Sequence, residues 1–200
     1  TEIYTLSLHD ALPIYGCANS ALNYMNDGIM YYRQKEFKGA LEKFDLALKQ
    51  DPKLPEIYYH RGKLYADWEE IEDRYKKAID DFTQSVSLDP RYTLGYNQRA
   101  LVYRIQGDTD NALRDYQTIL SIDPNNARAH YSIGILYKER YQTSKDIKEH
   151  NIAKNSFNKA IEIDPENISF YSDRAQIYMI EEEYQKAIDD NNKDIKLKQK

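Results

Sequence analysis

Apolar and aromatic residues recur along this chain at spacings of three, four and seven, which places them on one face of a helix. The segments with this pattern come in pairs, and four of the pairs end at an Asp-Pro step, at Asp51, Asp89, Asp123 and Asp164. Proline ends the second helix of each pair, because it lacks an N–H and pushes the preceding residue out of helical geometry. The pattern therefore predicts an all-α chain of helical hairpins.

The same residue types return at fixed distances from each proline. A ring lies six residues after it, a small residue ten after it and a tyrosine thirteen after it, while an alanine lies twelve residues before it and another ring eight before it. The small residues let paired helices approach closely, and the rings fill the space around them. In order, these positions hold Tyr58, Tyr96, His130, Tyr171; Gly62, Ala100, Gly134, Ala175; Tyr65, Tyr103, Tyr137, Tyr178; Ala40, Ala78, Ala112, Ala153; and Phe44, Phe82, Tyr116, Phe157. A half-copy, Tyr24, Gly28 and Tyr31, precedes the first proline.

A period of about 34 residues with this signature resembles the tetratricopeptide repeat family. The resemblance covers roughly residues 21–200 and implies a right-handed superhelical solenoid of five helical hairpins. It also implies a concave groove, lined by the first helix of each pair, that binds peptides or partner proteins. Ile119 departs from the family's alanine, so the third hairpin is expected to pack slightly farther from its neighbour.

The repeat positions divide the chain into five hairpins. A short leader covers 15–20, and the repeats are expected at 21–54, 55–92, 93–126, 127–167 and 168–200. The second repeat has an insertion of about four residues and the fourth one of about seven, close to one and two helical turns. We therefore expect longer helices around 67–75 and 138–151. Trp68, in the first insertion, either packs locally or contacts a partner, and the fifth repeat is either a polar cap or a shortened copy.

Residues 1–14 match, codon for codon, a common sequencing-library adapter read in one frame. We interpret them as an artefact of sequence assembly and leave them out of the fold. The sequence therefore does not decide whether a targeting signal or a domain precedes residue 15, or in which compartment the protein lies. The single cysteine, Cys17, is compatible with a cytoplasmic location.

Composition narrows the class of protein. The chain has 28 Lys and Arg residues against 33 Asp and Glu residues, a net charge of −5, with no basic block. This balance argues against nucleic-acid binding. No apolar stretch approaches the roughly 18 residues of a membrane span. The acidic residues of the second helices, Asp80, Asp81, Asp189 and Asp190, are expected on solvated faces.

Catalytic and metal-binding motifs have little support. The histidines outside 1–14 lack a second ligand at helical spacing, and His130 occupies a ring position of the repeat, where we expect it to pack. All seven glycines stand singly, so there is no phosphate-binding loop. We expect no enzymatic activity, cofactor or metal within the fragment.

Residues one past the repeat positions of the first helices differ between hairpins and are our candidate groove residues. They combine apolar anchors with basic groups, which suits an extended peptide with a hydrophobic side chain and some acidic character. The candidates are Met25, Ile29, Tyr59, Lys63, Asn97, Leu101, Arg104, Arg128, Tyr131, Ile135 and Lys138.

Some tetratricopeptide domains hold acidic chaperone tails in a carboxylate clamp, which we do not expect here. If the clamp begins in the first repeat, its two leading positions hold Met25 and Ile29, which cannot bind a carboxylate. If it begins in the second repeat, the clamp residues are matched only in part, by Tyr59, Lys63, Gln98, Arg128 and Ser132. Two functions stay open: a scaffold that binds a peptide or partner protein in the groove, and the regulatory or substrate-recruiting region of a larger enzyme or sensor.

Overall fold

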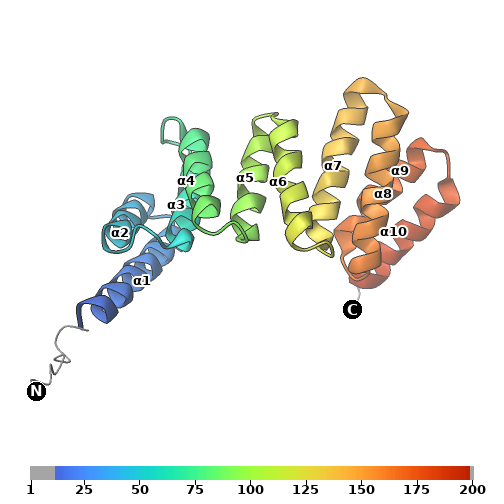
Figure 1. The fold of residues 1–200 in the computed structure, drawn as a ribbon. Coiled ribbons are helices and arrows are strands. Elements are labelled where there is room, and N and C mark those ends of the chain that lie inside the picture. The colour runs from blue at the N-terminus through green and yellow to red at the C-terminus, as the bar shows by residue number, and fades with distance from the viewer. Residues whose placement is uncertain (1–11, 199–200) are drawn as a thin grey trace, which may run out of the picture. The chain divides into compact units, whose positions relative to one another are not determined.

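The computed structural model describes residues 12–198, and these residues form ten α-helices and no strand (Figure 1). The all-α prediction is therefore confirmed. Residues 1–11, most of the adapter-like segment, lie outside the described part. The helices are α1 (Leu12–Arg33), α2 (Phe37–Gln50), α3 (Pro55–Asp67), α4 (Arg74–Leu88), α5 (Thr93–Ile105), α6 (Thr109–Ile122), α7 (Ala127–Ser144), α8 (Ile147–Ile163), α9 (Ile168–Ile180) and α10 (Tyr184–Lys198).

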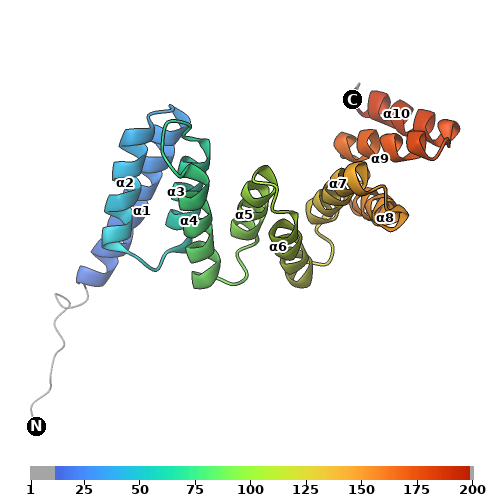
Figure 2. The ribbon, with the colours of Figure 1, turned by 90° about the horizontal axis from the view of Figure 1, so that it is seen from above.

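The chain divides into two compact units, and the boundary between them in the sequence follows Val102, within α5. In the first unit α1 pairs with α2 and α3 with α4; in the second α7 pairs with α8 and α9 with α10 (Figures 1 and 2). Between hairpins, α2 packs on α3, α6 on α7 and α8 on α9. Each unit thus consists of stacked hairpins with a core between their helices.

In three hairpins the core forms where a phenylalanine of the second helix meets a glycine of the first. Phe44, Phe82 and Phe157 are fully buried. A Cβ placed on the facing Gly28, Gly62 or Gly134 would lie 2.6–2.7 Å from the nearest ring carbon. The glycines are therefore required by this close approach, which no side chain would allow without displacing a ring.

The Asp-Pro steps end the second helices in a recurring turn. The aspartate N–H donates to the carbonyl four residues back, as from Asp51 to Ala47, and the carboxylate accepts a hydrogen bond from the N–H two residues on. The proline carbonyl then accepts a hydrogen bond from the next first helix, from Tyr58 Oη at 3.0 Å and Tyr171 Oη at 2.9 Å. His130 Nε2 lies 3.0 Å from the carbonyl of Pro124, so histidine replaces tyrosine in the same bond when Nε2 carries the proton.

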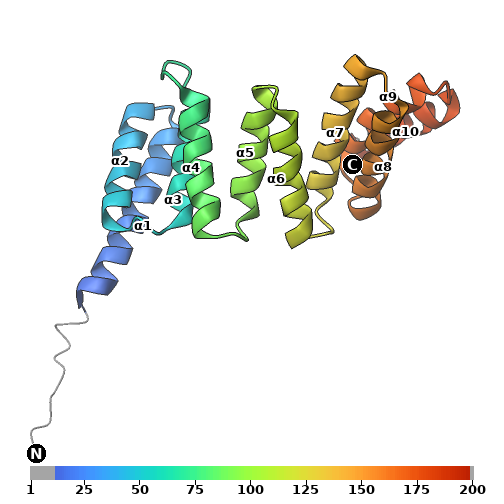
Figure 3. The same ribbon diagram turned by 45° about the horizontal axis from the view of Figure 1, so that its top comes forward.

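The two insertions are accommodated differently. After α3 ends at Asp67, residues 68–73 form a loop before α4, visible above the α3–α4 pair in Figure 3. The prediction of a longer helix around 67–75 is wrong, because Asp73 adopts a left-handed conformation (φ 55°) that interrupts the helix. The prediction for 138–151 is right in outline, since α7 has 18 residues and α8 has 17, separated by Lys145 and Asp146.

Two arginines of the first helices each bind a buried carboxylate of their own hairpin and an acceptor of the preceding hairpin. Arg61 makes two hydrogen bonds of 2.8 Å to Asp81 and one of 2.7 Å to Asp45 of the preceding hairpin. Arg174 does the same with Asp190, at 2.8 and 2.6 Å, and its third bond, of 2.9 Å, goes to Asn158.

These contacts correct one expectation from the sequence. Asp81 and Asp190 are each 6% exposed and ion-paired, whereas Asp80 and Asp189 lie in solvent as expected. An acidic residue alone does not show its partner in the sequence. The partners here, Arg61 and Arg174, each directly precede the small residue of their hairpin.

Candidate functional site

The eleven candidate groove residues lie on the first helices α1, α3, α5 and α7, but they differ in exposure. Met25 and Tyr59 are each 9% exposed and belong to hydrophobic clusters, so most of their surface stabilises the fold. Ile29 and Ile135 are half-buried against such clusters, and Arg128 is exposed. Asn97 and Leu101 are half-buried on α5. Ligand contact by any of them stays a prediction.

In the first unit, Lys63 lies between two tyrosine rings. Its Nζ is 5.6 Å from the ring centroid of Tyr32 and 5.8 Å from that of Tyr59. The hydroxyl of Tyr32 in turn donates a hydrogen bond to the carboxylate of Asp67. Within residues 12–198, Lys63 forms no ion pair. The aromatic faces hold an ammonium group without neutralising it.

The surroundings of Lys63 are positively charged and partly apolar. Arg33 is exposed at the end of α1 and lines an open pocket of about 470 Å3 with Asn26, Ile29, Met30 and Gln34. The side chain of Met30 is 49% exposed. This face therefore combines two cations with apolar surface.

His60 adds no charge to this surface near neutral pH. Burial, together with the nearby cations Lys63 and Arg33, lowers its pKa to about 4. Its ring stacks on Phe44 at 6.3 Å and meets the edge of Tyr59 at 5.0 Å. The neutral imidazole serves here as a packing group.

The lowered pKa of His60 predicts a pH-dependent stability of the first unit. The folded state favours the neutral ring; this preference is fully satisfied above the unfolded pKa of about 6.5 and is lost as pH falls towards 4. We expect acidification from pH 7 to pH 5 to cost about 1–2 kcal/mol through this group, after allowance for its partial exposure. Urea unfolding followed by Trp68 fluorescence should show this loss, and His60→Phe should remove it. An equal loss in both proteins would contradict the prediction.

In the second unit the candidate cations Lys138 and Arg104 form ion pairs. Lys138 Nζ lies 2.5 Å from Asp173 Oδ1 and 3.1 Å from Gln176 Oε1, while Tyr131 Oη donates to Asp173 Oδ2 at 2.5 Å. Burial and the adjacent carboxylate raise the pKa of Tyr131, which keeps its hydroxyl protonated. Arg104 pairs with Glu139 at 2.9 Å. The two units thus present different electrostatic surfaces.

Five members of these networks were not among the sequence candidates: Tyr32, Asp67, Glu139, Asp173 and Gln176. Tyr32 directly follows the repeat tyrosine Tyr31, just as the candidate Lys138 directly follows Tyr137. The rule that selected the groove candidates would therefore have selected Tyr32 as well. The acidic partners had no such signal, because their pairing depends on how adjacent hairpins stack.

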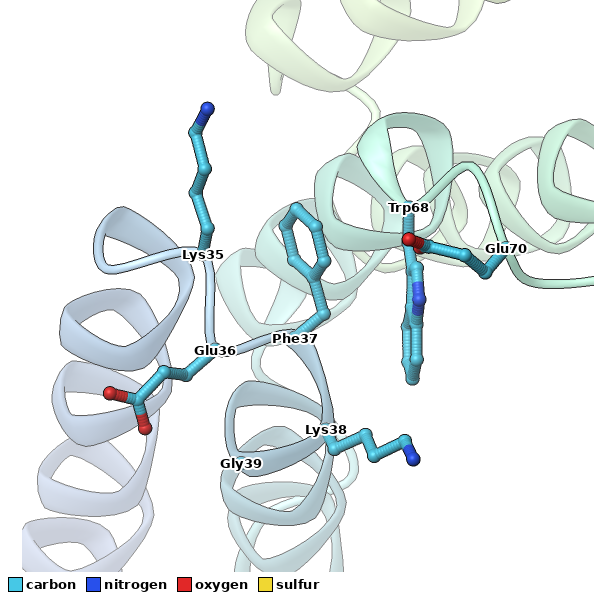
Figure 4. A pocket seen from close by; sticks show the side chains of 7 residues that line it. All are labelled: Lys35, Glu36, Phe37, Lys38, Gly39, Trp68 and Glu70. Atoms are coloured by element: carbon cyan, nitrogen blue, oxygen red, sulfur yellow. The ribbon is translucent and has the colours of Figure 1, made fainter.

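A second surface feature lies at the first insertion (Figure 4). Trp68 stacks on Phe37 with ring centroids 5.9 Å apart, and both line an open pocket of about 710 Å3 with Lys35, Glu36, Lys38, Gly39 and Glu70. Trp68 is half-buried, so it packs locally and keeps one part of its ring accessible. The lining mixes both charges and does not select one ligand class.

The described part of the chain shows neither a metal-binding cluster nor a membrane span. His, Cys, Asp and Glu side chains nowhere gather there in groups of three that could hold a metal ion. None of the described helices combines the length and the apolar character needed to cross a bilayer.

Family models match most of this chain. One described as "TPR repeat" matches residues 28–67 and 100–139, and two described as "Tetratricopeptide repeat" match 55–92 with 142–167 and 156–189. Together they cover well over half of the residues.

The chain belongs to the tetratricopeptide repeat (TPR) family.

Curated relatives share part of its length. The chain is 32% identical over 111 residues to a DnaJ homolog subfamily C member 7 homolog of Dictyostelium discoideum, covering 54% of this chain and 20% of that protein. It is 28% identical over 131 residues to serine/threonine-protein phosphatase 5 of Rattus norvegicus, covering 66% and 23%. The TPR chain thus spans about a quarter or less of these relatives.

Solved structures share the TPR fold. The crystal structure of MamA protein superimposes with a TM-score of 0.71 at 22% identity, covering 90% of this chain and 92% of that one. YrrB, described as a TPR protein with an unusual peptide-binding site, gives 0.64 at 21% identity, covering 88% and 86%. The predicted all-α solenoid is confirmed, and the TPR repeats support a protein-interaction scaffold, a class that is generally non-catalytic.

Proposed function

We propose that this TPR chain binds an extended peptide segment of a partner protein on the first-helix face of its first unit. The observation that carries the proposal is the uncompensated ammonium group of Lys63, held between the rings of Tyr32 and Tyr59. Keeping a cation half-buried without a carboxylate costs stability, and an anionic ligand would offset that cost.

The neighbouring surface defines the rest of the ligand. Arg33 adds a second cation beside an open pocket with apolar walls from Ile29 and Met30. A peptide with an acidic residue next to a large apolar residue matches this surface, since the charge orients the chain and the apolar side chain supplies buried area. The second unit, where Lys138 and Arg104 are already paired, would contribute less to binding an acidic ligand.

The test uses two synthetic peptides of eight residues that differ only in having glutamate or glutamine beside a central Leu-Leu pair. In fluorescence anisotropy at low salt we expect the acidic peptide to bind with a Kd on the order of micromolar and the neutral one at least about tenfold more weakly. Lys63→Met should weaken binding of the acidic peptide by about tenfold, because it removes the cation that lies over both rings.

The matched control is Arg104→Met, which removes a cation whose partner Glu139 is exposed and which should change the affinity by no more than about twofold. Equal affinities of the two peptides, or binding that survives Lys63→Met, would exclude the proposal.

A second candidate function follows from the length of the relatives. The chain matches about a quarter of a protein phosphatase, so a TPR region that recruits substrates or regulates an enzyme remains the alternative. Both functions use the same peptide-binding face and differ in what the partner does.

A further inference from the structure

A second charged group on α3 lies seven residues before Lys63. Glu56 belongs to the first turn of this helix and is half-buried. Its Oε2 is buried and accepts no hydrogen bond, and the side chain forms no ion pair in the described part of the chain. A carboxylate at the start of a helix is favoured there by hydrogen bonds from the free N–H groups, but Glu56 accepts none of them from the described residues. The fold therefore leaves this negative charge without a partner, although hairpins precede and follow α3 and α4.

Two tyrosine rings lie near this carboxylate. Tyr59 follows Glu56 by three residues, on the same side of α3. Its ring meets that of Tyr92 nearly at a right angle (88°), with 5.5 Å between the centroids. Tyr92 lies in the loop between α4 and α5, and burial together with the nearby charge of Glu56 raises its pKa. A carboxylate beside two rings is a surrounding that favours a cation.

The other hairpins do not repeat this combination. Glu56 stands six residues before the small residue of its repeat, and the equivalent positions hold Leu22, Leu94, Arg128 and Ser169. Tyr92 stands eight residues before the small residue of the next repeat, and the equivalent positions hold Ser20, Leu54, Asn126 and Asn167. Residues that the packing of every repeat requires, such as the alanine twelve residues before each proline, recur in all hairpins. The pair of carboxylate and ring is therefore particular to this face and is not a requirement of the repeat.

The separation of Glu56 and Lys63 sets a spacing for a ligand. Seven residues advance a helix by about 10.5 Å and bring the side chain back to the same face. The described helices offer no strand edge, so an extended peptide has no ladder to join, and polyproline II is the extended conformation that needs none. It rises about 3.1 Å per residue and turns once in three residues. Ligand side chains three residues apart thus lie about 9 Å apart on one side of the peptide, close to the separation on α3.

Lys63 lies between this carboxylate and the apolar pocket. Its Nζ is placed over Tyr32, which directly precedes the pocket residue Arg33 at the end of α1, in the preceding hairpin. It also lies over Tyr59, whose ring contacts Tyr92 at the start of the following hairpin. The order of groups on this face is therefore apolar pocket, cation, carboxylate. A matching ligand has the order apolar residue, acid, cation.

We propose that Glu56, Tyr59 and Tyr92 form a cation subsite, which binds an arginine side chain of the peptide ligand three residues from the acidic residue that binds Lys63. The inference rests on the proposed function, because it places the arginine relative to that acidic residue. Arginine fits better than lysine, since its planar guanidinium can stack on an aromatic ring while it donates hydrogen bonds to a carboxylate.

The probes are acidic eight-residue peptides with glutamate beside a central Leu-Leu pair and an arginine three residues from the glutamate, on the side away from the leucines. Both chain directions are made, because the surface fixes the order of the three groups but not the direction of the peptide. In a matched pair citrulline replaces arginine, which keeps the shape and removes the charge. For the direction that binds better, fluorescence anisotropy at low salt should give an affinity at least about fivefold higher with arginine than with citrulline.

Two variants of the full chain locate the effect. Glu56→Gln keeps the size of the side chain and removes its charge, so the arginine and citrulline peptides should then differ by less than about twofold. The affinity for the citrulline peptide should stay unchanged, which a general loss of structure would not allow. Glu42→Gln makes the same change of charge at an exposed position of α2 and should keep the difference between the peptides.

The outcomes separate this inference from the proposed function. If the acidic peptides bind through Lys63 but arginine and citrulline give equal affinities in both directions, the cation subsite is excluded and the proposed function stands. A difference that persists in Glu56→Gln would show that the arginine binds elsewhere and would overturn the assignment. Absence of binding by every peptide at about 1 mM would overturn both.

Discussion

Truncating Phe82 to alanine is expected to lower the free energy of unfolding of the first unit by about 3–5 kcal/mol. The ring is fully buried between α3 and α4 and packs in the cluster of Tyr59, Ala78 and Val102. Its removal loses the transfer energy of a large apolar group and leaves a cavity that two packed helices cannot close. The single tryptophan, Trp68, lies in the same unit, so its fluorescence in a urea titration reports the transition.

The partner glycine provides the control for this core. Gly62→Val alone should destabilise the unit, since its first side-chain carbon would lie 2.7 Å from the Phe82 ring. In the Phe82→Ala background the same valine enters vacated space and should cost less. Additive losses in the double mutant, or a loss below about 1 kcal/mol for Phe82→Ala, would show that the ring is not the main constraint.

Replacing Asp190 with alanine is expected to destabilise the second unit by about 3–5 kcal/mol. Arg174 and Asp190 are 17% and 8% exposed at their side chains, and they form two parallel hydrogen bonds. Burial would lower the pKa of Arg174, but the bonds to Asp190 raise it above its ordinary value. Without Asp190 the guanidinium stays charged, and its remaining partner, Asn158, is neutral. Hydrogen exchange in α9 and α10 measures the loss.

The first unit offers a matched comparison. Asp81→Ala leaves Arg61 paired with the carboxylate of Asp45, so it should cost less than Asp190→Ala. The double variant Arg174→Met with Asp190→Leu replaces the pair with apolar groups and should recover most of the stability. If Asp190→Ala and this double variant were equally unstable, the unpaired charge would not be the cause.

The repeat positions predict much of the fold because their requirements are local. A glycine opposite a phenylalanine predicts a close approach of two helices, and a proline after an aspartate predicts the end of a helix. The segment at Trp68 was not predicted correctly. An insertion of four residues fits an extra helical turn, but the chain forms a loop between α3 and α4. In this loop Trp68 packs against Phe37 of another hairpin, and such a contact cannot be read from the length of the insertion.

The candidate site was harder to predict for the same reason. Lys63 and Lys138 look alike in the sequence, as basic residues on first helices. Their charges differ in effect because Lys138 meets Asp173 of the next hairpin, whereas Lys63 lies over the rings of Tyr32 and Tyr59 and forms no ion pair within residues 12–198. Such pairing arises between hairpins and depends on how far one helix is displaced along its neighbour, which the spacing of repeat residues does not encode.

The arginine contacts between hairpins also bear on how such a chain can grow by duplication. Arg61, Arg99 and Arg174 all reach a side-chain oxygen of the hairpin before them, so a copied hairpin inserted at any of these three places would find a matching acceptor. Between α6 and α7 the corresponding residues are the exposed Gln117 and the buried Ile133, so this position has no arginine. A duplicated hairpin is therefore expected to be tolerated next to Arg61, Arg99 or Arg174. An insertion between α6 and α7 is expected to be selected against, because it would find no matching acceptor there.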